Sequence, residues 1–277
     1  MLAPYRRVLT KPGAWQFSTA GLVARLPISV VPISIVLMVT AYYDSYALAG
    51  RVSAVFAIAQ AVCAPQLAKL VDRIGQARVM RPSLAVSVVA LSGLAVAALL
   101  SSPEAVLYLT TGIAGATTGA MGAMVRARWS LILTDADQVH TAYSLESVFD
   151  ELVFVVGPVL ATFLATTIHP VAGLAVAAGA AGCGGFWLLS QRATEPAPSG
   201  RPVGTERRSV MRQGSMVTVA LVFVAVGLVF GGVDVTTIAF AEEQGLRSFA
   251  GVLLACLAVG SFSSGLLYGA RSFVSPL

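Results

Sequence analysis

Hydrophobic and polar positions fall in long blocks along the chain, so that extended apolar runs are separated by short polar segments. A helix that crosses a bilayer needs about 20 apolar residues. Only a helix satisfies its own backbone polar groups in lipid. The pattern therefore predicts eight membrane-spanning helices. They cover Ser18–Ala41, Tyr46–Leu70, Pro82–Ser101, Glu104–Val125, Ser147–Ile168, Pro170–Ser190, Met216–Phe240 and Ser248–Ala270.

The longest polar break runs from Gln191 to Ser215 and is rich in Pro, Gly and Arg, a composition typical of a flexible linker. We expect residues 1–190 to form a six-helix transmembrane half and residues 191–215 to form a cytoplasmic linker. Residues 216–277 would then be a partial second half with two helices. The other connections are short, so neighbouring helices should be antiparallel.

The composition supports a membrane location. The chain is 57% hydrophobic and only 11% charged, whereas a soluble domain carries about 25% charged residues. Most residues must therefore face lipid or other helices. The net charge of +5 does not indicate nucleic-acid binding, because the basic residues lie between the apolar runs and not on one face. The bilayer is the expected partner.

The basic residues also predict the orientation. If the N-terminus is cytoplasmic, the inner segments hold 15 of the 18 basic residues and the outer connections hold only Arg51 and Arg247. Lys and Arg concentrate in cytoplasmic loops of membrane proteins. The sequence therefore predicts a multi-pass protein of the cell (inner or plasma) membrane with its N-terminus inside.

The inner connection between the second and third spans carries the most specific chemistry. Asp72 and Arg73 end the second span, Gly75 permits a sharp reversal, and Arg78 opens the third. A carboxylate here can cap a facing helix N-terminus, and the arginines can pair with acids on neighbouring helices. Such a latch would hold one conformational state and break in the other.

This stretch resembles the loop 2–3 signature of the major facilitator superfamily. Ala68 stands where the signature usually has its first glycine. An ordinary basic loop is the alternative reading. The positions that match are Leu70, Asp72, Arg73, Gly75 and Arg78.

Two further stretches resemble the same family. Gly157–Pro158 resembles the centre of the antiporter motif of its exporters and should kink the fifth span, and Tyr268–Arg271 resembles a degenerate copy of the loop signature. The resemblance implies an all-α, major facilitator-type helical bundle with a complete six-helix N-terminal half and two helices of the C-terminal half. It also implies a secondary transporter that exports a small organic molecule by alternating access.

Charged residues within the spans are candidates for substrate or proton coupling, because ionisable groups at membrane depth are usually functional. Arg25 lies in the first span, and Asp150 and Glu151 lie about one turn into the fifth. We expect Arg25 to pair with Asp150 or Glu151. The alternative is a structural ion pair, or an Arg25 side chain that reaches the headgroups. Asp234, near the outer end of the seventh span, could bind a proton or a cation.

Other polar and small residues are expected to be structural. Arg126, Arg128 and Trp129 should anchor the fourth span at the interface. Glycine pairs four residues apart should let helices approach closely. These pairs are Gly115 with Gly119 and Gly265 with Gly269.

No metal or cofactor is expected. His140 and His169 fall in loops on opposite sides of the membrane, and the three cysteines lie singly in apolar runs. A membrane enzyme is a second functional class, but the spans contain no histidine and no G-x-S-x-G motif. The third is a truncated or split half without independent transport activity, either an inert remnant or a binding partner.

Overall fold

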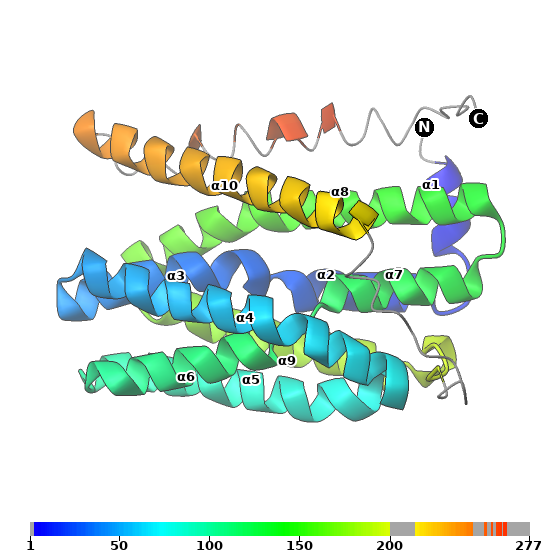
Figure 1. The fold of residues 1–277 in the computed structure, drawn as a ribbon, viewed down its shortest axis with the longest axis horizontal. Coiled ribbons are helices and arrows are strands. Elements are labelled where there is room, and N and C mark those ends of the chain that lie inside the picture. Colours follow the sequence, from blue (N-terminus) through cyan, green and yellow to red (C-terminus); the bar gives the residue numbers. More distant parts are fainter. Residues whose placement is uncertain are drawn as a thin grey trace. The chain divides into compact units, whose positions relative to one another are not determined.

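The structure is a computed structural model that describes residues 3–199 and 214–245, together with scattered positions between 252 and 264. Every element of regular secondary structure in residues 3–199 and 214–245 is a helix, which confirms the all-α class. The elements in chain order (Figure 1) are α1 Ala3–Leu9, α2 Ala14–Arg25, α3 Pro27–Tyr43, α4 Tyr46–Ile74, α5 Gln76–Leu99, α6 Glu104–Thr117, α7 Met121–Ile132, α8 Ala136–Phe163, the π-helical turn η1 Leu164–Ile168, α9 Ala172–Ser190, the 3₁₀ turn η2 Arg192–Thr194 and α10 Gly214–Glu243.

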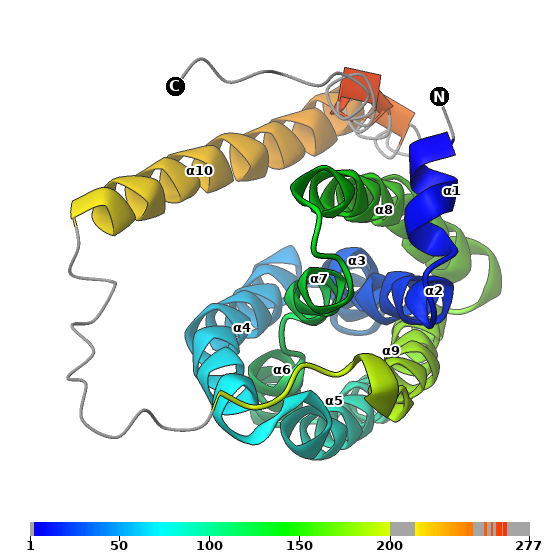
Figure 2. The same cartoon turned by 90° about the vertical axis from the view of Figure 1, so that its right-hand side faces the viewer.

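Helices α2 to α9 form one bundle and correspond to the first six predicted spans. α4 packs along α6, α2 packs along α9, and α5 lies between α6 and α9, as the end-on view in Figure 2 shows. Five helical stretches within the described residues are long and apolar enough to cross a membrane. These are Ala14–Tyr43, Tyr46–Ile74, Gln76–Leu99, Ala136–Ile168 and Ala172–Ser190.

The first and fourth spans are each interrupted. The first breaks at Leu26, because Pro27 has no N–H to continue the hydrogen-bond ladder and begins α3 instead. The fourth breaks between α6 and α7, where Gly119 has φ +66°. The backbone angle favours glycine at this position, whereas the nearest atom to an added Cβ, the terminal methyl of Met80, belongs to a flexible side chain that could move aside.

The fifth span begins earlier than predicted. α8 starts at Ala136, eleven residues before Ser147. The polar sequence of this first part suggested a loop, but the Asp135 side chain caps its first turn and the helix then continues without a break. This correction places Glu146 inside the helix.

The seventh predicted span corresponds to α10, which extends it by a few residues at each end. The eighth, Ser248–Ala270, is described only at scattered positions. Gly265, Gly269 and the Tyr268–Arg271 stretch lie outside the described residues.

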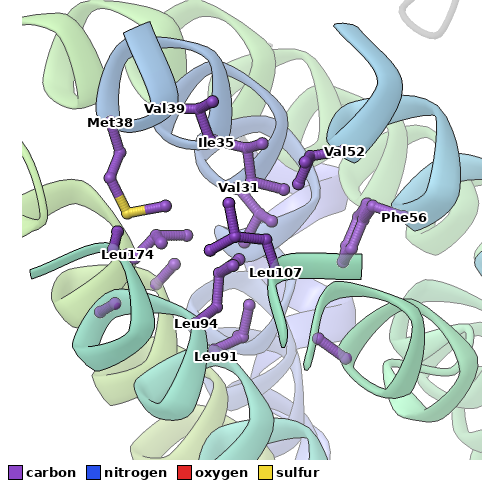
Figure 3. Close-up of a cluster of buried hydrophobic side chains, with 14 of the residues drawn as sticks. Val31, Ile35, Met38, Val39, Val52, Phe56, Leu91, Leu94, Leu107 and Leu174 are labelled. Carbon is purple, nitrogen blue, oxygen red and sulfur yellow. The ribbon is translucent and has the colours of Figure 1, made fainter. Parts of the chain in front are cut away.

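The core is built from aliphatic side chains on five helices (Figure 3). Val31, Ile35 and Met38 of α3 point into it and are fully buried. They meet Val52 and Phe56 of α4. The labelled set is completed by Val39 of α3, Leu91 and Leu94 of α5, Leu107 of α6 and Leu174 of α9.

The outside of the bundle is also apolar. Ile58, Val89 and Leu109 are 63%, 71% and 63% exposed, on α4, α5 and α6. Helices that are hydrophobic all round occur inside large proteins or in membranes. These outward-facing side chains therefore indicate contact with lipid.

Close helix contact depends on small residues, because lipid supplies no hydrophobic force between helices. A Cβ at Gly115 would overlap the backbone carbonyl oxygen of Phe56 on α4 and lie 3.2 Å from the Cβ of Ala59. Backbone cannot move aside as a flexible side chain can. Gly115 therefore sets the distance between α4 and α6.

We predict that Gly115→Ala lowers the free energy of unfolding by about 1–3 kcal/mol through overpacking. The matched control is Gly179→Ala on α9, where an added Cβ would meet nothing within 4 Å. Denaturant titration of the protein in mixed micelles measures both. Equal effects of the two substitutions would contradict the packing argument.

Candidate functional site

Arg25, at the C-terminus of α2, is the centre of a buried charge cluster. The side chain is only 5% exposed, and its Nε donates to the carbonyl oxygen of Gly21 in the preceding turn, at 3.0 Å. One guanidinium nitrogen, Nη2, forms an ion pair with Glu146 of α8. A buried charge needs such a partner, since desolvation alone would be very costly.

Glu146 is fully buried, and its carboxylate is saturated with donors. It accepts hydrogen bonds from Ser18 Oγ at 2.6 Å and from Trp129 Nε1 at 2.8 Å, in addition to the Arg25 ion pair. Trp129 is itself buried and packs edge-on against Phe17, with ring centroids 4.7 Å apart. Glu146 thus ties α2, α7 and α8 together.

Asp150 lies one turn further along α8 and is shared by two arginines. Its Oδ1 accepts from Arg25 Nη1 at 2.7 Å, and its Oδ2 accepts from Arg126 Nη2 at 2.6 Å. Asp150 and Arg126 are each 32% exposed, unlike Arg25 and Glu146. The cluster contains two positive and two negative charges, and only one pair of them can reach solvent or a ligand.

Glycines provide the space that these large side chains need. A Cβ at Gly122 of α7 would lie 3.2 Å from Arg126 Nη1 and 3.4 Å from Arg25 Cδ. Both arginines therefore pass over Gly122. Gly21 is similarly close, because a Cβ there would overlap the side chain of Val125.

The sequence identified only part of this cluster. The expected pairing of Arg25 with Asp150 is present, but Glu151 is not a member, and its carboxylate accepts a hydrogen bond from Ser261. Glu146 was missed because it preceded the predicted start of the span. A signal was available, since Glu146 and Asp150 are four residues apart and so share a helix face.

The expectation that Arg126, Arg128 and Trp129 anchor the helix at the interface is wrong. Trp129 and Arg128 are fully buried, and Arg126 belongs to the cluster. Neither arginine reaches for headgroups, because each has an internal partner.

The turn between α4 and α5 forms a second candidate site. Gly75 has φ +108°, a conformation that requires glycine, and joins the two helices directly. The Glu195 carboxylate, from the segment that follows α9, accepts from the Ala77 N–H at 2.9 Å and pairs with Arg192 at 2.9 Å. It therefore caps the N-terminus of α5, where the helix dipole favours a negative charge.

The start of the predicted linker is thus held in place. Arg128 donates to the carbonyl oxygen of Gln191 at 2.7 Å and to Thr194 Oγ1 at 2.9 Å, while its Nε donates to Gln76. Ser199 donates its N–H to the Asp72 carbonyl oxygen at 2.9 Å. Residues 191–199 are therefore tied to α4, α5 and α7 by these hydrogen bonds, and residues 200–213 lie outside the described residues.

The predicted latch residues take different positions around this turn. Arg78 lines a cleft of about 350 Å³ together with Gly75, Arg192 and Glu195. Within the described part of the chain, no ion pair forms at Asp72, Arg73 or Arg78. The acid that caps α5 is Glu195, which comes from the segment after α9 and not from a neighbouring helix.

The pKa of Glu195 is lowered. Burial of the carboxyl opposes this shift, but the hydrogen bond from Ala77 N–H, the hydrogen bond from Arg192 and the charges of Arg192 and Arg128 outweigh it. The folded state therefore favours the ionised form of Glu195.

The remaining candidates are Gly157, Pro158 and Asp234. Gly157 and Pro158 lie inside α8, which continues as a helix to Phe163. A Cβ at Gly157 would overlap the hydroxyl of Ser29, so this glycine permits close contact between α3 and α8. Asp234 lies in α10, but its side chain is outside the described residues.

Comparison with known proteins gives one result. The family model of the Major Facilitator Superfamily matches residues 17–275, which is most of the chain. A search of the curated proteins found no significant match.

We predict that Glu146→Gln lowers the free energy of unfolding by roughly 3 kcal/mol, the low end for breaking a buried ion pair, because Arg25 keeps Asp150. Glu104→Gln is the control. Glu104 pairs with Arg51 at 3.3 Å, but the two side chains are 51% and 60% exposed, so the loss should stay under about 1 kcal/mol. Denaturant titration in mixed micelles compares the two variants. A larger loss of unfolding free energy for Glu104→Gln would contradict the assignment of Glu146 as the stabilising buried partner of Arg25.

A second prediction concerns pH. Because the folded-state pKa of Glu195 lies below the ordinary 4.5, its contribution is complete above that value and is lost as the pH falls through the lowered pKa. We expect Glu195→Gln to increase hydrogen exchange at the Ala77 amide at neutral pH. The difference from the unmodified protein should vanish in strong acid. Protection factors, normalised to the intrinsic rate at each pH, measure this, and a difference that grows on acidification would refute it.

Proposed function

Since the chain belongs to the Major Facilitator Superfamily, a family of membrane transporters and not enzymes, we propose that it is a proton-coupled secondary transporter that works by alternating access. The supporting observation is the partly exposed Asp150 carboxylate, held between Arg25 of α2 and Arg126 of α7. A carboxylate at such a position can change its charge while the surrounding helices remain packed.

Protonation of Asp150 has a local mechanical consequence. The neutral carboxyl no longer attracts Arg126, and one of the ties between α7 and α8 weakens. Arg25 keeps its position, because the Glu146 ion pair and the hydrogen bond to Gly21 are unaffected. Asp150 would then be the switch and Glu146 the fixed anchor, and the difference in partners gives the two carboxylates separate roles.

The inner turn is proposed as the conformational latch. Asp72, Arg73, Gly75 and Arg78 supply the family signature, and Glu195 holds the start of the linker against it. Movement of the linker would therefore be transmitted to the α4–α5 turn.

Direction, orientation and the other charged positions complete the proposal. Export is supported by the Gly157–Pro158 element, and a cytoplasmic N-terminus in the cell membrane by the distribution of basic residues. Glu151 and Asp234 remain candidates for proton or substrate coupling.

We predict that Asp150→Asn uncouples transport from protons. A thermal-shift screen of the purified protein against metabolites and drugs first supplies a ligand. In proteoliposomes, the variant should keep exchange of labelled for unlabelled ligand but lose accumulation driven by a pH gradient. Asp137→Asn, an exposed acid on the same helix, should keep both.

Full gradient-driven accumulation by Asp150→Asn would reject proton coupling at this residue. Ligand binding without exchange by the unmodified protein would instead favour the alternative, a transporter half that binds but does not transport.

A further inference from the structure

We infer that the charge cluster selects small organic anions that carry a carboxylate, and that the substrate carboxylate replaces Asp150 on Arg126. This inference rests on the proposed transport function and adds the chemical class of the substrate to it. The observation behind it is that Asp150 pairs with two arginines, whereas Arg126 pairs with Asp150 alone within the described part of the chain.

The charged groups that face Asp150 come from three helices. They are Arg25 on α2, Arg126 on α7 and Glu146 on Asp150's own helix, α8. Arg25 divides its guanidinium between Glu146 and Asp150. Arg126 pairs with Asp150 alone, as far as the described part of the chain extends.

Exposure limits which of these groups a ligand can reach. Glu146 is fully buried and Arg25 is 5% exposed, whereas Arg126 and Asp150 are each 32% exposed. A molecule that approaches the cluster therefore meets one guanidinium and one carboxylate.

The two exposed groups are not equally available. A cation would have to compete for Asp150 against two guanidinium groups, at 2.7 and 2.6 Å. An anion has to displace only Asp150 from Arg126, and Asp150 then keeps Arg25. Guanidinium binds a carboxylate through two parallel hydrogen bonds. The substrate carboxylate can therefore take over the interaction that the Asp150 carboxylate makes with Arg126.

Protonation of Asp150 strengthens the preference of the cluster for an anion over a cation. With Asp150 ionised, the four charges cancel; with Asp150 neutral, the cluster carries one net positive charge. An anion restores the balance, so proton binding and anion binding should each favour the other by the same factor. A cation would be repelled from the protonated cluster.

Two exposed hydroxyl groups lie beside the backbone carbonyl of Arg126. Ser130 Oγ and Tyr143 Oη lie 2.7 Å apart, and the Tyr143 hydroxyl also donates to the Arg126 carbonyl oxygen at 3.4 Å. Each hydroxyl carries a single proton, which these contacts and the Ser130 hydrogen bond to the same carbonyl occupy, so the anion is held by the Arg126 guanidinium and not by these groups.

The cluster contains its own reporter. Trp129 donates to Glu146, which shares Arg25 with Asp150, and it is one of only three tryptophans in the chain. In the background Trp15→Phe, Trp187→Phe, fluorescence reports from Trp129 alone. The probes are benzoate and benzamidinium, which have the same size and shape but opposite charge.

We expect benzoate, and not benzamidinium, to change the Trp129 emission in a saturable manner in detergent or nanodiscs. Arg126→Gln should weaken benzoate binding about tenfold or more. Asp150→Asn, which mimics the protonated form, should tighten it about tenfold. Arg51→Gln, an exposed arginine whose partner is Glu104, is the matched control and should leave binding unchanged.

Saturable binding of benzamidinium, absence of benzoate binding, or benzoate binding that Arg126→Gln leaves intact would each overturn the inference. The transport assay separates it from the proposed function. Benzoate binding that depends on Arg126, in a protein whose Asp150→Asn variant keeps full gradient-driven accumulation, would support the anion site and contradict proton coupling at Asp150.

Discussion

The buried ion pair between Arg25 and Glu146 is the interaction on which the arrangement of this bundle depends. Removing two charges from water has a large unfavourable free energy of desolvation. The ion pair offsets it only if every hydrogen-bond donor and acceptor of the two groups has a partner. Here Ser18 and Trp129 complete the carboxylate, while Asp150 takes the remaining side of the guanidinium. One polar network therefore fixes α2, α7 and α8 relative to one another.

The apolar part of the bundle imposes less specificity. Side chains are hydrophobic on the inside and on the lipid-facing outside, so burial alone does not determine which face of a helix turns inward. Glycines do so instead, because Gly115 and Gly122 lie where a backbone or a long side chain passes at close range. The breaks at Leu26 and Gly119 shorten the rigid segments and allow the charged residues to meet.

The sequence was sufficient for the helical class, for the approximate positions of the helices between residues 14 and 190 and for the turn at Gly75, because membrane thickness and glycine geometry act locally. It was not sufficient for Glu146, whose polarity suggested a loop. A buried acid is stable only with partners from distant segments, and those partners are visible only in three dimensions. The same limit applies to Glu195, since nothing in a Pro-rich stretch indicates that its carboxylate caps another helix. Trp129 was misread because an aromatic residue beside arginines has the same local pattern at an interface and in a core.

A double-mutant cycle on Arg25→Met and Glu146→Gln, followed by unfolding in mixed micelles, tests the central claim most directly. The amide oxygen that Glu146→Gln introduces can still accept from Trp129 and Ser18, so the cycle isolates the charge pair. The account predicts that the double variant loses less stability than the two single variants together, by at least about 1 kcal/mol. Additive losses would show that the two residues do not interact and would contradict the account.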